Sequence, residues 1–296
     1  MTKAVKTIKI LGYHNLPLFT YVYDEVENPR GVIIIVHGME EHAGRYKNFA
    51  KFLNSKGFIV LANDLRGHGH TAPCKALFGF GERNIFVESV IDEICIIKYA
   101  KKAYRLPVYL FGHSYGSMLS QSIIQHTNIV EKAVLCGTTD GNSLPMQVGA
   151  FLTKIIYPFQ NKEKVCKVVE NFSLKAYGRK FDKGNWLTKD EKIYDAYMKD
   201  ELRGEHFPFS FYYSLSQNMS KINKHIHKIG DKKVFLIAGT DDPVGSYGKY
   251  VKTLYKRYLK NGINVKLKLY KGDRHELINE TDKKQVYADV IDFYEK

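Results

Sequence analysis

The feature that most constrains this chain is an uninterrupted run of β-branched residues, Gly31-Val32-Ile33-Ile34-Ile35-Val36. An apolar run without polar alternation predicts a strand buried on both faces, as in a parallel sheet covered by helices. Further strands are predicted at 58–62, 108–111, 133–136, 234–238 and 265–270. Apolar residues at helical spacing lie between several of these strands, as at 84–104. The alternation predicts an α/β fold with a mostly parallel central sheet and helices on both faces.

The ends of the chain complete this pattern. Two opening strands, at 7–10 and 16–23, are predicted to form a hairpin through Gly12–Asn15. Three more helices are predicted, at 44–55, 249–261 and 284–294. The sheet elements therefore fall into two blocks that are separated by about a quarter of the chain.

Between the two blocks, from 140 to 209, the sequence contains no buried strand. Ser143 is typical of a helix start, and one apolar helical face follows it, made of Leu144, Val148, Phe151, Leu152 and Ile155. Similar patterns predict helices at 165–172 and 189–202. We therefore expect a core domain of residues 1–139 and 210–296, with residues 140–209 inserted as a helical cap.

The composition is that of an ordinary soluble protein. The chain has 296 residues, of which 44% are hydrophobic and 26% are charged. No run approaches the roughly 18 apolar residues of a membrane span. Residues 1–6 include two lysines and lack the apolar segment of a signal peptide, so we expect a cytoplasmic location.

The formal net charge is +14, but the lysines are scattered along the whole chain. We interpret this charge as a solubilising surface and expect no nucleic-acid partner, because no nucleic-acid-binding motif is present. Peripheral contact with an anionic membrane is a second interpretation. The four cysteines, Cys74, Cys95, Cys136 and Cys166, form no Cys-x-x-Cys pair. We expect free thiols and no zinc site.

A candidate nucleophile lies in Gly112-His113-Ser114-Tyr115-Gly116. The pentapeptide fits Gly-x-Ser-x-Gly and stands between a predicted strand and a helix-compatible run. This context is required by a nucleophile elbow, a strained turn that exposes the serine above a strand end. Short motifs recur by chance, so Ser114 needs a base, an acid and an oxyanion hole elsewhere in the chain.

The candidate acid and base each follow a later strand. Asp242 comes after the strand at 234–238, and its Asp-Pro step begins a turn that can direct a carboxylate across the site. The neighbouring Asp241 is the alternative acid. His275 comes directly after the strand at 265–270. The chain order Ser114, Asp242, His275 is one of the known orders of a catalytic triad.

The oxyanion hole requires two backbone N–H groups. One is assigned to Tyr115, the residue after the nucleophile. The other is expected in the loop after the first buried strand, where Gly38 lets the backbone turn toward the site. We therefore select Met39.

Several segments together resemble the α/β-hydrolase superfamily, in its monoacylglycerol lipase and lysophospholipase branch, which is also called serine aminopeptidase-like. The segments that carry the resemblance are His37-Gly38-Met39-Glu40-Glu41-His42-Ala43-Gly44-Arg45-Tyr46, Asp64-Leu65-Arg66-Gly67-His68-Gly69, residues 112–117, Asp242-Pro243-Val244-Gly245 and Arg274-His275-Glu276. The resemblance implies hydrolysis of carboxylic esters of apolar acyl chains, with no metal and no organic cofactor. The region 140–209 resembles the family only loosely.

Two other functions stay open at this point. A peptidase or amidase of the proline iminopeptidase type is one, although such enzymes carry a Gly-Gly-Pro-Gly-like oxyanion loop that is absent here. A non-catalytic binding protein on the hydrolase scaffold is the other. The oligomeric state stays open as well.

The remaining histidines and polar residues near these motifs are interpreted as structural. His68 and His70 lie on a glycine-rich loop without a third metal ligand nearby. His37, His42, His113 and Asp64 are expected to fix loops or to pack. The pair Arg45-Tyr46 is expected to serve the start of a helix and packing.

Overall fold

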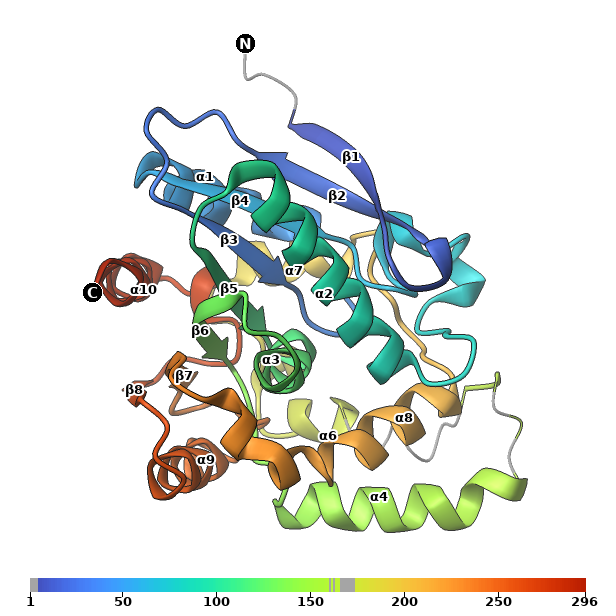
Figure 1. Ribbon diagram of the computed structural model, residues 1–296. Helices are drawn as coiled ribbons and strands as arrows, with labels where there is room; N and C mark the ends of the chain where they lie inside the picture. Colours follow the sequence, from blue (N-terminus) through green and yellow to red (C-terminus); the bar gives the residue numbers. More distant parts are fainter. Residues whose placement is uncertain (1–4, 160, 162, 166–173) are drawn as a thin grey trace.

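The computed structural model describes residues 5–159, 161, 163–165 and 174–296, and a single sheet of eight strands forms its centre (Figure 1). The strand order is β1-β2-β4-β3-β5-β6-β7-β8. β2 is antiparallel to β1 and to β4, whereas all pairs from β4 to β8 are parallel. The strands are β1 Lys6–Leu11, β2 Pro17–Tyr23, β3 Gly31–Val36, β4 Phe58–Asn63, β5 Val108–His113, β6 Val130–Cys136, β7 Lys233–Gly239 and β8 Val265–Tyr270. The predicted mostly parallel sheet and opening hairpin are confirmed.

Helices cover both faces of this sheet because the buried strands are apolar on both sides. In β3, Val32 and Ile34 join one hydrophobic cluster, while Ile33 and Ile35 join the cluster on the opposite face. The first cluster is closed by α2 Ile85–Tyr104, α3 Tyr115–His126 and α9 Lys249–Lys260, and the second by α1 Lys47–Ser55 and α10 Lys283–Glu295. The alternation of side chains along a strand thus gives the sheet two cores.

The segment between β6 and β7 is helical, as predicted. It contains α4 Leu144–Ile156, α6 Leu174–Gly178, α7 Glu191–Met198 and α8 Phe209–Met219. Figure 1 shows α4 and α8 packed side by side at the lower edge of the molecule. α8 is buried through aromatic residues such as Phe209 and Phe211, and the helix also contacts α2.

Some predicted boundaries differ from the structure. The helix expected at 189–202 is confirmed only as α7, because Asp190 caps it by accepting hydrogen bonds from the N–H groups of Lys192 and Ile193. The helix expected from 44 begins with a 3-10 turn, Ala43–Tyr46, before α1. The helix expected at 165–172 lies mostly outside the described residues. α8 has no counterpart among the predicted helices.

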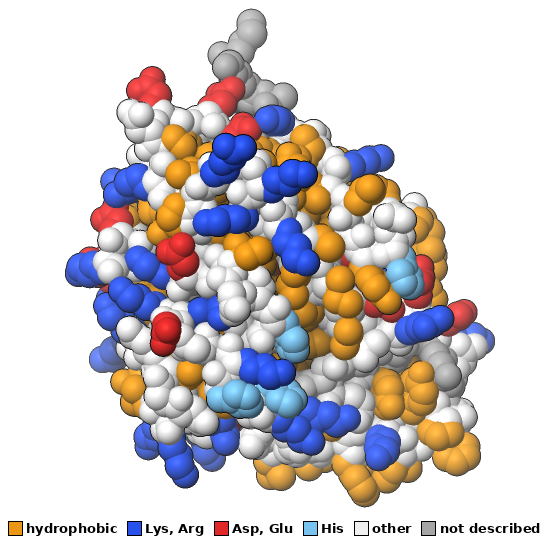
Figure 2. All heavy atoms as spheres, in the orientation of Figure 1, with side chains coloured by type: hydrophobic (Ala, Val, Ile, Leu, Met, Phe, Trp, Pro, Cys, Tyr) orange, Lys and Arg blue, Asp and Glu red, His pale blue; other side chains and the backbone are white. Residues whose placement is uncertain are grey.

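The surface matches the scattered distribution of basic residues in the sequence. Figure 2 shows Lys and Arg side chains dispersed over the visible face, with acidic groups between them. Cys74, Cys95 and Cys136 are free thiols, as expected, and Cys166 lies outside the described residues. In the part of the chain that the structure describes, no helix has the length and apolar character needed to span a membrane.

A buried acid, Glu93, lies on the face of α2 that packs against the sheet. The Oε1 atom of Glu93 accepts a hydrogen bond from the side-chain amide of Asn63 in β4, at 2.7 Å. Neither Oε2 of Glu93 nor Oδ1 of Asn63 has a partner among the described residues. Burial, together with the charge of Asp92, raises the pKa of Glu93 to about 8, against the hydrogen bond from Asn63. The fold therefore favours the neutral carboxylic acid, which is also the form that can donate a hydrogen bond.

Glu93→Gln is expected to stabilise the protein at alkaline pH. Folding raises the pKa of Glu93. Its contribution to the free energy of unfolding is therefore greatest at pH values below the pKa of the unfolded chain, and it is lost as the pH rises through about 8. The amide of glutamine cannot ionise, so the variant does not lose this stability as the pH rises. We expect the free energy of unfolding of the variant to exceed that of the wild type by about 1–3 kcal/mol near pH 9, with a much smaller difference near pH 5.

Urea unfolding at the two pH values measures this difference. The surface variant Glu131→Gln serves as the control and should change little at either pH. An equal effect of Glu93→Gln at both pH values would contradict the explanation by titration.

Candidate active site

Ser114 occupies a strained turn between β5 and α3. Its backbone has φ 51° and ψ −119°, a conformation that non-glycine residues adopt rarely. The N–H of Ser114 donates to the carbonyl of Cys136, at the end of β6, at 2.9 Å. The side chain is half-buried and lines a small pocket. The predicted strand–turn–helix context is confirmed.

The two glycines of the motif are required by close backbone contacts. A Cβ atom on Gly116 would lie 2.1 Å from the carbonyl oxygen of Val36 in β3. A Cβ atom on Gly112 would lie 2.6 Å from the carbonyl oxygen of Gly116. Both distances are far below van der Waals contact, so a side chain on Gly116 would force α3 away from β3, and one on Gly112 would force α3 away from β5. The spacing of the glycines thus follows from the packing of α3 against the sheet.

His275 and Asp242 meet beneath the same pocket. The Nδ1 atom of His275 lies 2.9 Å from Oδ1 of Asp242, and both side chains are fully buried. The contact has the length of an ion pair without the alignment of a hydrogen bond. The N–H of Val244 also donates to Oδ1 of Asp242, at 2.9 Å, and so fixes the carboxylate.

The alternative acid, Asp241, lies apart from this pair. It is exposed, and its carboxylate lies 3.2 Å from the hydroxyl of Thr240. The Nε2 atom of His275 has no hydrogen-bond partner among the described residues, although it is buried. Ser114 and His275 both line the small pocket, so the unpartnered nitrogen belongs to the same site as the serine.

Met39 lies on the loop after β3, at the edge of this pocket. Its N–H makes no hydrogen bond within the described part of the chain, whereas the N–H of Gly38 is taken by Glu41, at 2.6 Å. Tyr115 is the first residue of α3, where N–H groups lack an intrahelical acceptor. The two N–H groups selected from the sequence are therefore available to a bound oxygen atom.

A buried charge network supports the loop that carries Met39. Glu41 accepts hydrogen bonds from Tyr46, at 2.8 Å, and from Arg45, at 2.7 Å. Arg45 also forms two parallel 2.8 Å hydrogen bonds with Glu276, the residue after His275. Arg45 therefore joins the Met39 loop to the His275 loop. Arg45 lies at the start of a helix, as expected, in the 3-10 turn before α1, and its link to Glu276 is a further role that was not predicted.

Only one of the two ion pairs of Arg45 could be expected from the sequence. Glu41 and Arg45 are four residues apart, a spacing that suggests a local ion pair. Glu276 is 231 residues from Arg45, and no local pattern connects the two.

The other polar residues near the motifs fix loops, as expected. The Nδ1–H group of His37 donates to the carbonyl of Gly38, at 2.8 Å, and its Nε2 atom accepts from the N–H of Leu65. Asp64 accepts hydrogen bonds from the N–H groups of Ala43 and His70, at 2.8 and 2.7 Å. The side chains of His37 and Asp64 thus bind backbone groups of neighbouring loops and have a structural role.

Two adjoining cavities lie above Ser114. The small pocket has a volume of about 30 Å³, and it shares Glu40, Trp186, Leu187 and Tyr197 with a larger cavity of about 590 Å³. The larger cavity is also lined by aromatic and basic side chains, among them Tyr194, Tyr212, Arg179 and Arg203. Its size lies in the range of small-molecule sites.

The helical insertion contacts both loops of the site. The N–H of Glu276 donates to the carbonyl of Leu187, at 2.7 Å, and the ring of Trp186 lies 5.0 Å from that of His275. The guanidinium of Arg45 stacks on the ring of Tyr197, in α7, with its Cζ atom 4.5 Å from the ring centroid. These contacts form the wall between the site and the insertion.

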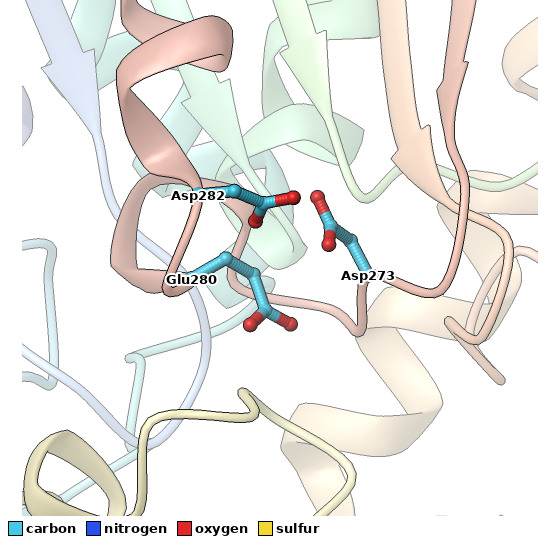
Figure 3. A group of neighbouring side chains, drawn as sticks. All are labelled: Asp273, Glu280 and Asp282. Carbon is cyan, nitrogen blue, oxygen red and sulfur yellow. The ribbon is translucent and has the colours of Figure 1, made fainter.

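Three acidic side chains gather below the His275 loop, as Figure 3 shows for Asp273, Glu280 and Asp282. The ammonium group of Lys189 lies 2.5 Å from Asp273 and 3.8 Å from Asp282. Glu280 accepts hydrogen bonds from the backbone N–H groups of Arg274 and Lys189. Lys189 thus pairs with two of the three carboxylates and, through its backbone, with the third, which ties the His275 loop to the segment between β6 and β7.

Comparisons with known proteins identify the family. The sequence pattern of the family described as serine aminopeptidase, S33, matches residues 27–282. A monoglyceride lipase homolog of monkeypox virus is 25% identical, over 92% of each chain. The phospholipase YtpA of Bacillus subtilis is 24% identical, over 89% of this chain and 94% of its own.

The fold agrees as well. The crystal structure of a thermostable carboxyl esterase from Bacillus coagulans, in complex with glycerol, superimposes with a TM-score of 0.90 at 26% identity, over 99% of both chains. The chain belongs to the serine aminopeptidase S33 family, and it is a carboxylic-ester hydrolase with the α/β-hydrolase fold.

Proposed function

We propose that this enzyme hydrolyses esters of apolar acyl chains, of the monoacylglycerol or lysophospholipid type, through an acyl-enzyme on Ser114. The observation that carries the proposal is the buried His275–Asp242 pair, whose free Nε2 atom shares a pocket with Ser114. A serine hydroxyl is a weak nucleophile and needs such a base to take its proton.

In the first half-reaction, Ser114 Oγ attacks the ester carbonyl carbon and transfers its proton to Nε2 of His275. The negative charge that develops on the carbonyl oxygen is stabilised by the N–H groups of Met39 and Tyr115, each worth about 3–4 kcal/mol in sites of this kind. Asp242 stabilises the imidazolium and holds its orientation. The tetrahedral intermediate then collapses, and His275 protonates the leaving alcohol.

In the second half-reaction, water takes the place of the alcohol. His275 removes a proton from this water, which attacks the acyl carbon bonded to Ser114 Oγ. The second tetrahedral intermediate uses the same two N–H groups. It collapses to release the carboxylic acid, and Ser114 regains its proton from His275. No step calls for a metal or an organic cofactor.

The cavity supports an apolar acyl group with a polar head. The part shared by the two cavities contains Trp186, Leu187 and Tyr197, which can pack against a hydrocarbon chain. The names of the relatives point to both glycerides and phospholipids. Arg179 and Arg203 line the larger cavity together with Glu205, which pairs with Arg203, and this mixed lining suits a polar head group.

Residues 140–209 act as a cap over this site. The proposal is supported by the hydrogen bonds of the His275 loop to 185–188 and by the contact of Tyr197 with Arg45. A second contact joins the cap to the Met39 loop, since Nε2 of His42 lies 2.9 Å from the carboxylate of Asp200. The cap thereby supplies walls that the sheet domain lacks.

The surface of the cap also favours the interpretation that the protein makes peripheral contact with an anionic membrane. Its helix α4 exposes Leu144, Phe151, Leu152 and Ile155, each at least 49% accessible, and Figure 2 shows hydrophobic side chains along the lower edge where α4 lies. The single charged side chain of α4 is Lys154. An apolar helix face on a chain of net charge +14 suits a lipid surface with negative head groups.

Ser114→Ala is the direct test of the mechanism. We expect hydrolysis of p-nitrophenyl esters to fall by about 10⁴-fold or more, because no other group in the pocket can form the acyl-enzyme. Labelling by a fluorophosphonate probe should be lost with it. Asp242→Asn should lose activity comparably, whereas Asp241→Asn should stay within about threefold of the wild type.

Two outcomes would contradict the proposal. Equal labelling of folded Ser114→Ala would overturn the assignment of the nucleophile. A wild type that neither labels nor hydrolyses esters of any chain length would favour a non-catalytic binding protein, and faster cleavage of p-nitroanilides than of the matched esters would favour an amidase.

Leu152→Ser is the test of membrane contact. Leu152 in α4 and Leu259 in α9 are each 49% exposed, so Leu259→Ser is a matched control. In co-sedimentation with vesicles that contain phosphatidylserine, at low salt, we expect Leu152→Ser to weaken binding about tenfold and Leu259→Ser to leave it unchanged. Equal effects of both substitutions, or no binding by the wild type, would contradict the proposed surface.

A further inference from the structure

His113, the residue before the nucleophile, contacts two hydrogen-bond acceptors. Its Nδ1 atom lies 3.1 Å from Oε1 of Glu41, and its Nε2 atom lies 3.4 Å from the carbonyl oxygen of His275. The ring is 3% exposed, so water does not compete for either nitrogen. One side of His113 therefore touches the Met39 loop, and the other touches the backbone of the proposed base.

A neutral imidazole fits this arrangement poorly. It carries one N–H group and one lone pair. With the proton on Nδ1, the lone pair of Nε2 would face the carbonyl oxygen of His275. With the proton on Nε2, the lone pair of Nδ1 would face a carboxylate. Only the imidazolium, in which both nitrogens carry protons, satisfies both contacts.

The state of Glu41 excludes the reverse arrangement, in which the carboxyl group donates. Oε1 of Glu41 accepts from the N–H of Gly38 and from the hydroxyl of Tyr46, and Oε2 accepts from Arg45. Although burial opposes its charge, Arg45 and His113 hold the pKa of Glu41 well below its ordinary value. Glu41 is therefore an ionised acceptor, and Nδ1 of His113 must donate to it.

The charges of the whole network balance only with a cationic His113. Glu41 and Glu276 supply two negative charges, and Arg45 supplies one positive charge, all with side chains at most 10% exposed. The other groups that face His113 add no countercharge to this network: Tyr46 donates a hydroxyl, burial lowers the pKa of His37 to about 4, which keeps it neutral, and the ring of His275, 4.9 Å away, is paired with Asp242 instead. A neutral His113 would leave one buried negative charge without compensation.

We propose that His113 is a positioning residue, held as an imidazolium, that joins the Met39 loop to the backbone of His275. The effect of His113 on catalysis rests on the proposed function, because His113 acts by keeping the oxyanion donors and the base at a fixed separation. Burial opposes the charge, but the hydrogen bond and the charge of Glu41 outweigh it and raise the pKa of His113 above its ordinary value. The bonds made by His113 are thus retained to a higher pH than an unperturbed histidine would allow, and they are lost as the pH rises through this raised pKa.

Nitrogen-15 NMR of the full chain with labelled histidine tests the protonation directly. The signals of His113 are identified by their loss in His113→Asn. At about pH 7, where an unperturbed histidine is mostly neutral, we expect both ring nitrogens of His113 to carry protons. Glu41→Gln should convert His113 to a neutral ring with one unprotonated nitrogen. Ser114→Ala, which leaves the network intact, should keep both protons.

Steady-state kinetics tests the positioning role. Asparagine can retain the bond to Glu41 but cannot reach both acceptors, so His113→Asn should lower kcat by about tenfold or more while KM changes less than about threefold. Glu41→Gln should show the same split.

Each result bears on a separate claim. A wild-type His113 with one unprotonated ring nitrogen at about pH 7 would overturn the imidazolium. A folded His113→Asn with unchanged kcat would overturn the positioning role. The NMR readout does not depend on activity, so it stands even if labelling of Ser114 overturns the proposed function.

Discussion

Parallel pairing of the central strands is the constraint on which the rest of the structure depends. Because β3, β5, β6, β7 and β8 run in the same direction, their carboxyl ends lie along one edge of the sheet. Ser114, Asp242, His275 and Met39 each follow one of these ends. Residues more than 200 positions apart in the sequence therefore share one pocket without any local signal between them.

This convergence also concentrates charge in a region that excludes water. The fold compensates with paired groups: Arg45 lies between two carboxylates and His113 lies against Glu41, while the partly exposed Lys189 pairs with Asp273. Buried pairs of this kind add little net stability, since desolvation of the ions offsets their attraction. Their value here is geometric, because each pair ties a loop of the site to another loop or to the cap.

Much of the sheet and the candidate residues could be predicted from the sequence because their signals are local. Gly31–Val36 is apolar on both faces, and the Ser114 elbow needs glycines at fixed spacing to pass β3. The bond of Arg45 to Glu276 and the two acceptors of His113 could not be predicted, since they depend on contacts across 231, 72 and 162 residues. α8 was missed because its aromatic residues pack against two other helices and follow no single apolar stripe.

The central claim is that Ser114 forms a covalent acyl-enzyme, and mass spectrometry of a trapped intermediate tests it most directly. A carbamate ester transfers a carbamoyl group that is released slowly, so the adduct survives digestion. We predict one carbamoyl group per chain, on the peptide that contains Ser114 and assigned to its side chain by fragmentation. A folded protein that hydrolyses esters but carries the adduct on another residue, or carries none, would contradict the account.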